Sequence, residues 1–526
     1  MDQSPTRQDN GRRAPEQPMA AIDMGSNSFR LEIGQLQQGR YRRVDYRKET
    51  VRLGAGLDAQ GLLGEEAAER GLTCLRGFAA RLADFAPTQV RAVATQTLRE
   101  AKNRDHFLLR AQQALGHPIE VISGREEARL IYAGVAHLQP SDEPRLVIDI
   151  GGRSTEIILG QGQQPQVAES FAVGCVSLTM RFFPEGVVSE AGFRAAQVAA
   201  GAELEEALQA FAPTRWQRAL GSSGTAGAAS QILQAAGISD GRITPDGLRW
   251  CIEKLLQAGH VQRIDLPGLK PERRAVLPGG LALLYTLCAH FKIDTLWPAK
   301  GALRQGVIVD LHERLLAQRQ QRGGRHRGMA LDTRDLSVGE LQRRFQSDLA
   351  QAQRVRDVAL ELFDAAAAAP ITLASDAPAV DSRQELAWAC ALHEVGLVVS
   401  HHDHHRHSAY LVAHADAAGF SQNQQRRLAD LVLAQRGGLR KVETQLTNNS
   451  YALPLLCLRL AVIKCHARGD VDVHALSLSV QGRDACLTYK ADWAETHPRT
   501  LYLLTEEAAA WAKNGALRLQ LRTSSR

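Results

Sequence analysis

Short apolar runs that end in glycine-rich polar turns recur in the N-terminal part of the chain. The run VIDIGGRSTEIILGQG (147–162) predicts a buried strand, a glycine turn and a second strand. The segment AIDMGSNSFRLEIGQL (21–36) has the same pattern, with Asp, Gly and Ser matched at a constant offset of 126 residues, as from Asp23 to Asp149. We interpret the pair as an internal duplication, which predicts two similar halves that face each other across a cleft.

The segments between and after these turns alternate between strand and helix periodicity. A strand leading into a polar turn is predicted at 90–100, a helix at 105–116, a strand at 118–124 and a helix at 125–138. The segment at 218–233 repeats the strand, glycine turn and helix order. This alternation predicts an α/β fold.

The remaining segments complete the predicted domain organisation. Residues 1–18 are polar and carry no apolar core, so we expect a disordered tail and no signal peptide. The chain is then divided into a first α/β domain (19–140, completed by 304–316), a second α/β domain (141–303), a helical domain (317–470) and a small α+β domain (471–526).

The composition indicates where the protein is located more clearly than it indicates which reaction the protein catalyses. Hydrophobic residues make up 44% and charged residues 23% of the 526 residues, which is ordinary for a folded soluble protein. The most apolar stretch (275–291) is interrupted by Pro278 and Gly279 and predicts a buried helix, not a membrane span. Eight cysteines without CxxC pairs favour reduced thiols and a cytoplasmic location; peripheral membrane association is left open, and no nucleic-acid partner is expected.

The net charge of +6 is modest, but basic residues cluster at 39–52. The cluster is explained either by a solvated strand face or by a track for a polyanion, because clustered cations attract phosphate chains. The residues of this predicted track are Arg40, Arg43, Arg47, Lys48 and Arg52.

The two glycine turns have the composition of a phosphate site. Glycine allows backbone amides to approach an anion closely, and nearby hydroxyl and amide side chains add donors. Carboxylates would repel a phosphate unless a divalent cation lay between them, so Asp23, Asp149 and Glu156 predict a Mg²⁺ site. The predicted phosphate-binding residues are Gly25, Ser26, Asn27, Ser28, Gly151, Gly152, Ser154 and Thr155, with Gly224 and Thr225 at the later turn.

Two acids follow Ser123-Gly124 at the predicted start of a helix. Glu126 and Glu127 are explained as helix-capping acids, which the helix dipole favours. A glutamate beside a phosphate-lined cleft is alternatively a general base. With an ordinary pKa it would be ionised at neutral pH and would need no special tuning.

Taken together, seven ordered motifs resemble the exopolyphosphatase and guanosine pentaphosphate phosphatase family, within the actin-like, sugar-kinase-like ATPase superfamily. The motifs are AIDMGSNSFR, VATQTLREAKN, VISGREEARLIYAGV, VIDIGGRSTE, ALGSSGT, LPGGLALL and KGALRQGV. The segment LHEVGLVVSHHDHHRHSAYLV (392–412) resembles the HD-like helical domain of longer members. The resemblance covers almost everything after the tail.

The resemblance implies duplicated actin-like (ribonuclease-H-like) domains and processive, Mg²⁺-dependent removal of terminal phosphate from inorganic polyphosphate. Glu127 matches the proposed base, Asp149 the acid that positions magnesium or water, and Arg99 an arginine that grips the terminal phosphate. Glu156 matches an acid of the same site. A homodimer is also implied.

Two segments depart from the family pattern. Relatives usually carry Gly or Ala where this chain has Arg153, which we expect to be tolerated and to point to the cleft or solvent; the alternative is that it inactivates the site. Seven histidines lie between His393 and His414, but the HD-type metal set is incomplete because the pair is His393-Glu394 and no histidine lies at 328–392. We therefore expect a degenerate helical domain that binds substrate or a partner.

Three alternatives to polyphosphate hydrolysis stay open. Guanosine pentaphosphate hydrolysis uses the same chemistry and is the nearest one. An ATP-dependent kinase of the same superfamily would need an acceptor pocket and an aspartate base. A non-catalytic polyphosphate or nucleotide sensor would follow if Arg153 had disabled hydrolysis.

Overall fold

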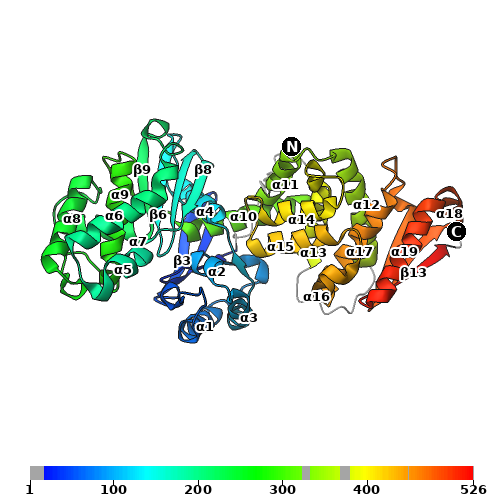
Figure 1. Cartoon of the computed structure of the whole chain (residues 1–526), viewed down its shortest axis with the longest axis horizontal. Coiled ribbons are helices and arrows are strands. Elements are labelled where there is room, and N and C mark those ends of the chain that lie inside the picture. Colours follow the sequence, from blue (N-terminus) through cyan, green and yellow to red (C-terminus); the bar gives the residue numbers. More distant parts are fainter. Residues whose placement is uncertain (1–16, 323–331, 368–378, 448, 525–526) are drawn as a thin grey trace, which may run out of the picture. The chain divides into compact units, whose positions relative to one another are not determined.

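The structure is a computed structural model that describes residues 17–322, 332–367, 379–447 and 449–524. It consists of two compact units that divide between residues 331 and 332 (Figure 1). Most of the predicted disordered tail therefore lies outside the described residues.

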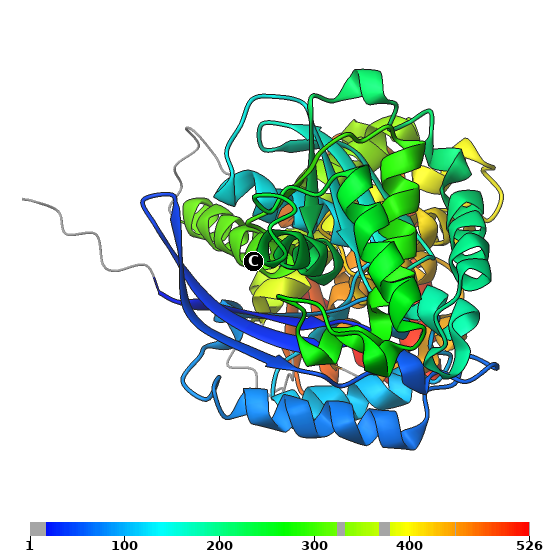
Figure 2. The same ribbon diagram turned by 90° about the vertical axis from the view of Figure 1, so that its left-hand side faces the viewer.

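The first half of the first unit is built on a five-stranded mixed sheet. Its strands are β1 (Met19–Met24), β2 (Phe29–Gln37), β3 (Arg40–Glu49), β4 (Val90–Ala94) and β5 (Ile119–Val121), in the order β3-β2-β1-β4-β5. The β1–β2 and β2–β3 pairs are antiparallel, whereas β1–β4 and β4–β5 are parallel. The β2–β3 hairpin runs alongside helix α1 (Figure 2).

The second half repeats this sheet strand for strand. Its strands are β6 (Arg145–Ile150), β7 (Thr155–Gln161), β8 (Gln164–Phe171), β9 (Arg218–Ser222) and β10 (Leu296–Pro298), in the order β10-β9-β6-β7-β8. Corresponding pairs have the same directions. The register also shifts at the matched glycines Gly34 and Gly160, where an added Cβ would overlap the side chains of Tyr41 and Tyr132. The predicted duplication and α/β class are confirmed.

Helices pack around the two sheets. The first half carries α1 (Glu65–Ala79), α2 (Gln96–Glu100), α3 (Arg104–Leu115) and α4 (Gly124–Leu138). The second half carries α5 (Cys175–Phe182), α6 (Glu190–Leu204), α7 (Ser223–Ala235), α8 (Pro245–Ala258) and α9 (Leu277–His290). The helices predicted at 105–116, 125–138 and 275–291 are present, whereas the polar turn predicted after β4 is the short helix α2.

Helix α10 (Leu303–Arg322) closes the first unit by packing against α4 and β1. The two helices approach so closely that a Cβ on Gly306 would overlap the Leu130 carbonyl oxygen. Glycine is therefore required at this crossing. Because α10 continues through residue 317, the predicted domain boundary there falls inside a helix of the first unit.

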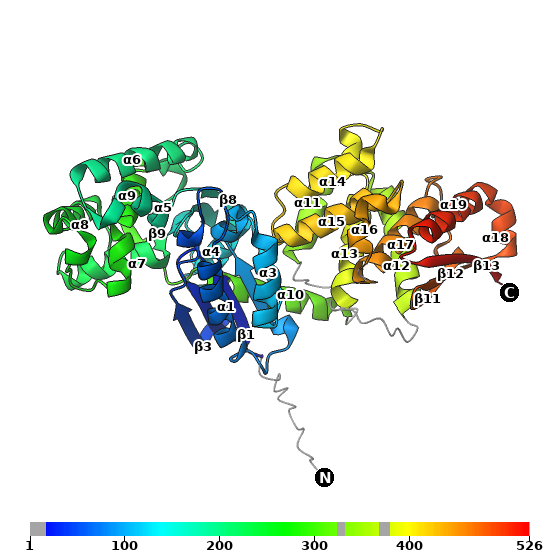
Figure 3. The same ribbon diagram turned by 60° about the horizontal axis from the view of Figure 1, so that its bottom comes forward.

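The second unit begins with helices and ends with a small sheet. The helices are α11 (Thr333–Arg344), α12 (Leu349–Ala367), α13 (Ala379–Leu392), α14 (His404–His414), α15 (Gln422–Ala434), α16 (Glu443–Leu446) and α17 (Asn449–Lys464). They are followed by β11 (Leu476–Gln481), β12 (Asp484–Lys490), α18 (Ala491–Thr496), α19 (Pro498–Asn514) and β13 (Arg518–Ser524), with sheet order β11-β12-β13 (Figure 3).

The helical and α+β parts of the second unit share one hydrophobic core. Arg459 of α17 donates to both carboxylate oxygens of the buried Glu507 in α19, at 2.5 and 2.7 Å. A fully engaged ion pair of this kind ties the two parts together. None of the described helices combines the length and apolar character needed to span a bilayer.

Candidate functional site

The two glycine turns of the duplication meet at one narrow cavity of about 80 Å³. One turn follows β1 and the other follows β6, so both lie at the carboxyl ends of the central strands of their sheets. A Cβ added to Gly25 would lie 3.2 Å from the Ser28 carbonyl oxygen, and a Cβ added to Gly151 would lie 3.0 Å from the Ser154 carbonyl oxygen. The two halves therefore contain the same turn. The predicted cleft between the halves is thus present as a shared crevice.

Most of the predicted phosphate-binding residues line this cavity. The lining residues among them are Gly25, Ser26, Asn27, Ser28, Gly151, Gly152, Ser154 and Gly224. Thr155 and Thr225 do not line it, because their hydroxyls donate to the carbonyl oxygens of Val173 (2.6 Å) and Ile150 (3.4 Å). The hydroxyl of Ser28 is buried and has no partner among the described residues, so it is available to a ligand.

Three carboxylates, those of Asp23, Glu127 and Asp149, line the same cavity. Burial, partly opposed by Arg99, raises the pKa of Glu127 to about 7. Burial also raises the pKa of Asp149. The expectation of an ordinary pKa for Glu127 was therefore wrong, because the sequence did not reveal how completely the carboxyl group is removed from water.

Glu156 lies behind this group of acids. Its carboxylate accepts a hydrogen bond from the Ser170 hydroxyl at 2.8 Å and does not line the cavity. Burial, together with the charges of Glu127 and Asp149, raises its pKa well above the usual value. Burial and the neighbouring negative charges thus favour the protonated form of this carboxyl group.

The two acids at the start of α4 have different partners. Ser123 caps the helix by accepting from the Glu126 amide at 3.1 Å, and the Glu126 carboxylate pairs with Arg129 at 2.7 Å. Glu127 instead points its carboxylate toward the cavity and Arg99. The capping interpretation thus applies at Glu126, whereas the interpretation of Glu127 as a general base stays a prediction.

Arg99 contacts Glu127 and does not line the cavity. Its Nη1 donates to Glu127 Oε2 at 2.8 Å and to the Ile122 carbonyl oxygen at 3.1 Å. Its Nε and Nη2 donate to Gln96 Oε1 at 2.9 and 2.6 Å. In this structure Arg99 orients Glu127, whereas a direct grip on phosphate stays a prediction.

Three arginines that the sequence analysis did not select also line the cavity. Arg30 and Arg304 lie 3.5 and 3.4 Å from Asp23 Oδ2, and the guanidinium of Arg273 lies against Gly224. Arg30 could have been found, because antiparallel pairing of the hairpin places it opposite Asp23. Arg273 and Arg304 come from distant segments, for which no local pattern gives a signal.

Arg153 points neither into the cavity nor to open solvent. Its Nε and Nη2 donate to Glu100 Oε2 at 3.0 and 2.7 Å, and its Nη1 donates to the Gly54 carbonyl oxygen at 3.3 Å. Its φ is not positive, so the turn does not demand glycine at this position. Arg153 thus reaches from the second half to acceptors in the first half, which the sequence did not reveal.

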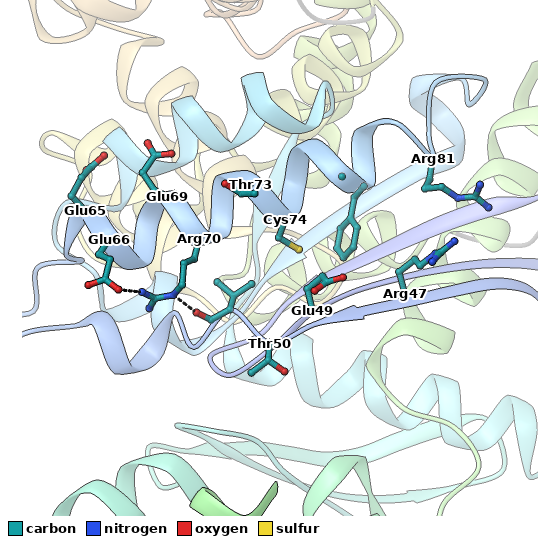
Figure 4. A pocket seen from close by; sticks show the side chains of 13 residues that line it. Arg47, Glu49, Thr50, Glu65, Glu66, Glu69, Arg70, Thr73, Cys74 and Arg81 are labelled. Carbon is teal, nitrogen blue, oxygen red and sulfur yellow. Dashed lines mark hydrogen bonds and ion pairs between the residues drawn. The ribbon is translucent and has the colours of Figure 1, made fainter. Parts of the chain in front are cut away.

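The residues of the predicted basic track lie on two faces of the sheet, because successive side chains of β3 point in opposite directions. Arg47 lines an open groove of about 920 Å³ between β3 and α1, together with Glu49, Arg70 and Arg81 (Figure 4). Lys48 lies 3.5 Å from Glu272 and is opposite Arg30 of the cavity in the strand pairing. The cations of β3 therefore do not form one continuous face.

The other members of the predicted track also differ in their surroundings. Arg43 lies over the Tyr46 ring, at 5.5 Å from its centroid. The backbone amide of Arg52 donates to the Asn27 carbonyl oxygen at 2.9 Å, which ties the end of the hairpin to the first turn. Arg40 lies at the exposed start of β3.

The histidine-rich segment lines a separate cavity of about 530 Å³ in the second unit. His393 is buried with its Nδ1 2.7 Å from the Cys390 carbonyl oxygen, and His404 Nε2 lies 3.1 Å from Arg436 Nη1. Within the described ranges, no group of three or more His, Cys, Asp or Glu residues could hold a metal ion. The HD-like assignment of this unit stays a prediction.

Comparison with known proteins shows which family this chain resembles over most of its length. A model of the Ppx/GppA phosphatase family matches residues 33–315, and a model of domain III of the same phosphatases matches residues 333–508. The crystal structure of an exopolyphosphatase-like protein is 26% identical, with a TM-score of 0.52, over 58% of this chain and 100% of that one. An exopolyphosphatase from Cytophaga hutchinsonii ATCC 33406 is 24% identical, with a TM-score of 0.52, over 56% of this chain and 97% of that one.

Proposed function

Because the chain belongs to the Ppx/GppA phosphatase family, we propose that it is an exopolyphosphatase, which hydrolyses the terminal phosphate of inorganic polyphosphate and releases orthophosphate. The supporting observation is the single narrow cavity that combines the two glycine turns, three carboxylates and three arginines. The cavity suits a terminal phosphoryl group and leaves the rest of the polymer outside.

The reaction assigned to this site is an attack of water on the terminal phosphorus. Glu127 Oε2 is held by Arg99 Nη1 at 2.8 Å, so we assign Glu127 Oε1 to the water, whose proton it accepts. The bond from the water oxygen to phosphorus forms as the bond to the bridging oxygen breaks, and the shortened chain leaves with that oxygen. Backbone amides of the two turns, together with Arg30 and Arg273, stabilise the charge on the phosphoryl oxygens.

Magnesium is part of the proposal. Asp23 and Asp149 carry the oxygen ligands that Mg²⁺ prefers, and Mg²⁺ takes its remaining ligands from substrate phosphates and water. Glu156 fits less well, because Ser170 and a raised pKa hold its carboxyl group away from this role. When bound, the ion would offset the charge of the phosphate oxygens beside these acids.

The test is a parallel measurement of orthophosphate release from long-chain polyphosphate and from guanosine pentaphosphate, with and without Mg²⁺. We expect faster release from polyphosphate, dependence on Mg²⁺, and no release by Glu127→Ala, which should still fold and bind polyphosphate. If orthophosphate were released from guanosine pentaphosphate but not from polyphosphate, guanosine pentaphosphate would be the substrate in place of polyphosphate. Transfer of labelled γ-phosphate from ATP to an acceptor would favour a kinase, and tight binding without release would favour a sensor.

A homodimer and a cytoplasmic location remain predictions that rest on the family resemblance and on the cysteine content. All eight cysteines are unpaired in the structure.

A further inference from the structure

Arg153 and Glu100 form an ion pair that joins the two halves of the first unit. Arg153 belongs to the glycine turn between β6 and β7, whereas Glu100 ends α2 in the other half. Two guanidinium nitrogens share one carboxylate oxygen, at 3.0 and 2.7 Å. The side chains are only 22% and 32% exposed, so solvent screens this pair less than an ordinary surface pair.

The pair continues as a chain of hydrogen bonds that ends at Glu127. Glu100 Oε1 accepts from Gln96 Nε2 at 2.6 Å, and Gln96 Oε1 accepts from Arg99 Nε and Nη2. Arg99 Nη1 then donates to Glu127 Oε2 at 2.8 Å. The amide of Gln96 has one donor end and one acceptor end, so holding its NH₂ group at Glu100 turns its carbonyl oxygen toward Arg99.

Close packing limits where Arg153 can go. A Cβ added to Gly54 would lie 2.9 Å from Arg153 Cδ and 3.0 Å from Ser26 Cβ. The stem of Arg153 therefore packs against the segment that also supports the first glycine turn, because the Gly54 amide donates to the Ser26 carbonyl oxygen at 2.8 Å. In this structure Arg153 therefore contacts the first half through both its guanidinium group and its stem.

We propose that Arg153 is a positioning residue of this chain, which clasps Glu100 across the two halves and, through Gln96 and Arg99, holds Glu127 in its productive orientation. The inference rests on the proposed function, because it assigns Glu127 as the base. It makes the orientation of Glu127 depend on closure of the halves around a phosphoryl group. The departure from glycine at this turn thus adds a contact and does not obstruct the cavity.

Hydrogen–deuterium exchange of the free protein tests the clasp without any substrate. We expect Arg153→Gly and Glu100→Gln each to speed exchange in both partner segments, at 94–104 and at 149–155, and Arg153→Lys to have a smaller effect. The matched control is Arg81→Gly, because Arg81 donates through the same two nitrogens to Asp45 Oδ2, at 3.2 and 2.6 Å, within the first half alone. Exchange in these segments that equals that of the wild type would overturn the clasp, whatever the activity of the protein.

Steady-state kinetics test the positioning role. We expect kcat to fall about tenfold in Arg153→Gly, the effect of losing one charge-assisted hydrogen bond, with little change in KM. Glu100→Gln should give a similar loss, and the double variant should be no worse than either single variant, because both break one chain. Additive losses, or wild-type kcat in Arg153→Gly, would remove Arg153 from the positioning of Glu127.

The exchange experiment and the kinetic experiment distinguish a failure of the clasp from a failure of the proposed function. If the wild-type protein released no phosphate from any tested substrate, the proposed function would fail while the exchange experiment still decided whether the clasp exists. A swap, Arg153→Glu with Glu100→Arg, adds a further check. It should restore slow exchange but not kcat, because an arginine at position 100 would turn the Gln96 carbonyl oxygen away from Arg99.

Discussion

At the scale of single residues, the ionisation of Glu127, which we propose as the base, sets the pH range in which the proposed reaction can proceed. Burial opposes its negative charge more strongly than Arg99 supports it, and the neighbouring Asp23 and Asp149 add repulsion. The group therefore binds its proton more tightly than a glutamate in water does. A base of this strength is well matched to work near neutral pH.

We predict that kcat/KM for polyphosphate rises with pH and reaches half of its maximum near pH 7, because Glu127, whose pKa is raised to about 7, must lose its proton to accept one from water. The measurement is a profile of kcat/KM between about pH 5 and 9, the range that brackets this pKa. Arg99→Met should move the midpoint upward, since Arg99 favours the charged carboxylate. A wild-type profile that stays flat from pH 5 to 9 would contradict this prediction, because a glutamate with its ordinary pKa of about 4.3 is already ionised over that range.

At the scale of elements, strand alternation decides which basic side chains can serve the cavity. Neighbouring residues of β3 point to opposite faces of the sheet. Lys48 lies opposite Arg30, which lines the cavity, whereas Arg47 lines the groove that faces α1. A basic run in the sequence is thus divided between two surfaces.

Lys48→Ala and Arg47→Ala form a matched pair on one strand. We predict that Lys48→Ala weakens polyphosphate binding and lowers the slope of log Kd against log salt by about one, because one fewer cation meets the polymer. Arg47→Ala should leave both quantities close to the wild-type values. Binding titrations at several salt concentrations measure both effects, and equal losses in the two variants would contradict the division of the strand.

At the scale of the whole molecule, helix α10 connects the two halves of the first unit. It follows the second half in the sequence but packs against elements of the first half. It returns to pack on α4 and β1, so residues far apart in the sequence complete the cavity; Arg304 of α10 reaches Asp23 in this way. The crossing of α10 and α4 depends on a close approach at Gly306.

We predict that Gly306→Ala destabilises the protein by about 1–3 kcal/mol, because the added methyl group overlaps the Leu130 carbonyl oxygen and must separate the helices. The control is Gly77→Ala in α1, where an added Cβ meets nothing within 4 Å and the helix should gain up to about 1 kcal/mol. Thermal unfolding followed by circular dichroism measures both. An unchanged Tm for Gly306→Ala would mean that the crossing is loosely packed.

The amino-acid sequence alone determined the duplication, the two glycine turns, the acids of the central strands and Glu127 at the start of its helix. Each of these features can be predicted from a short stretch of residues, because strands, turns and helix starts depend on local sequence patterns. Only the tertiary structure decided that Arg273 and Arg304 line the cavity, that Arg153 binds Glu100, that β3 divides its cations, and that burial raises the pKa of Glu127. These features depend on which distant segments meet and on how much water they exclude, and no local pattern encodes either quantity.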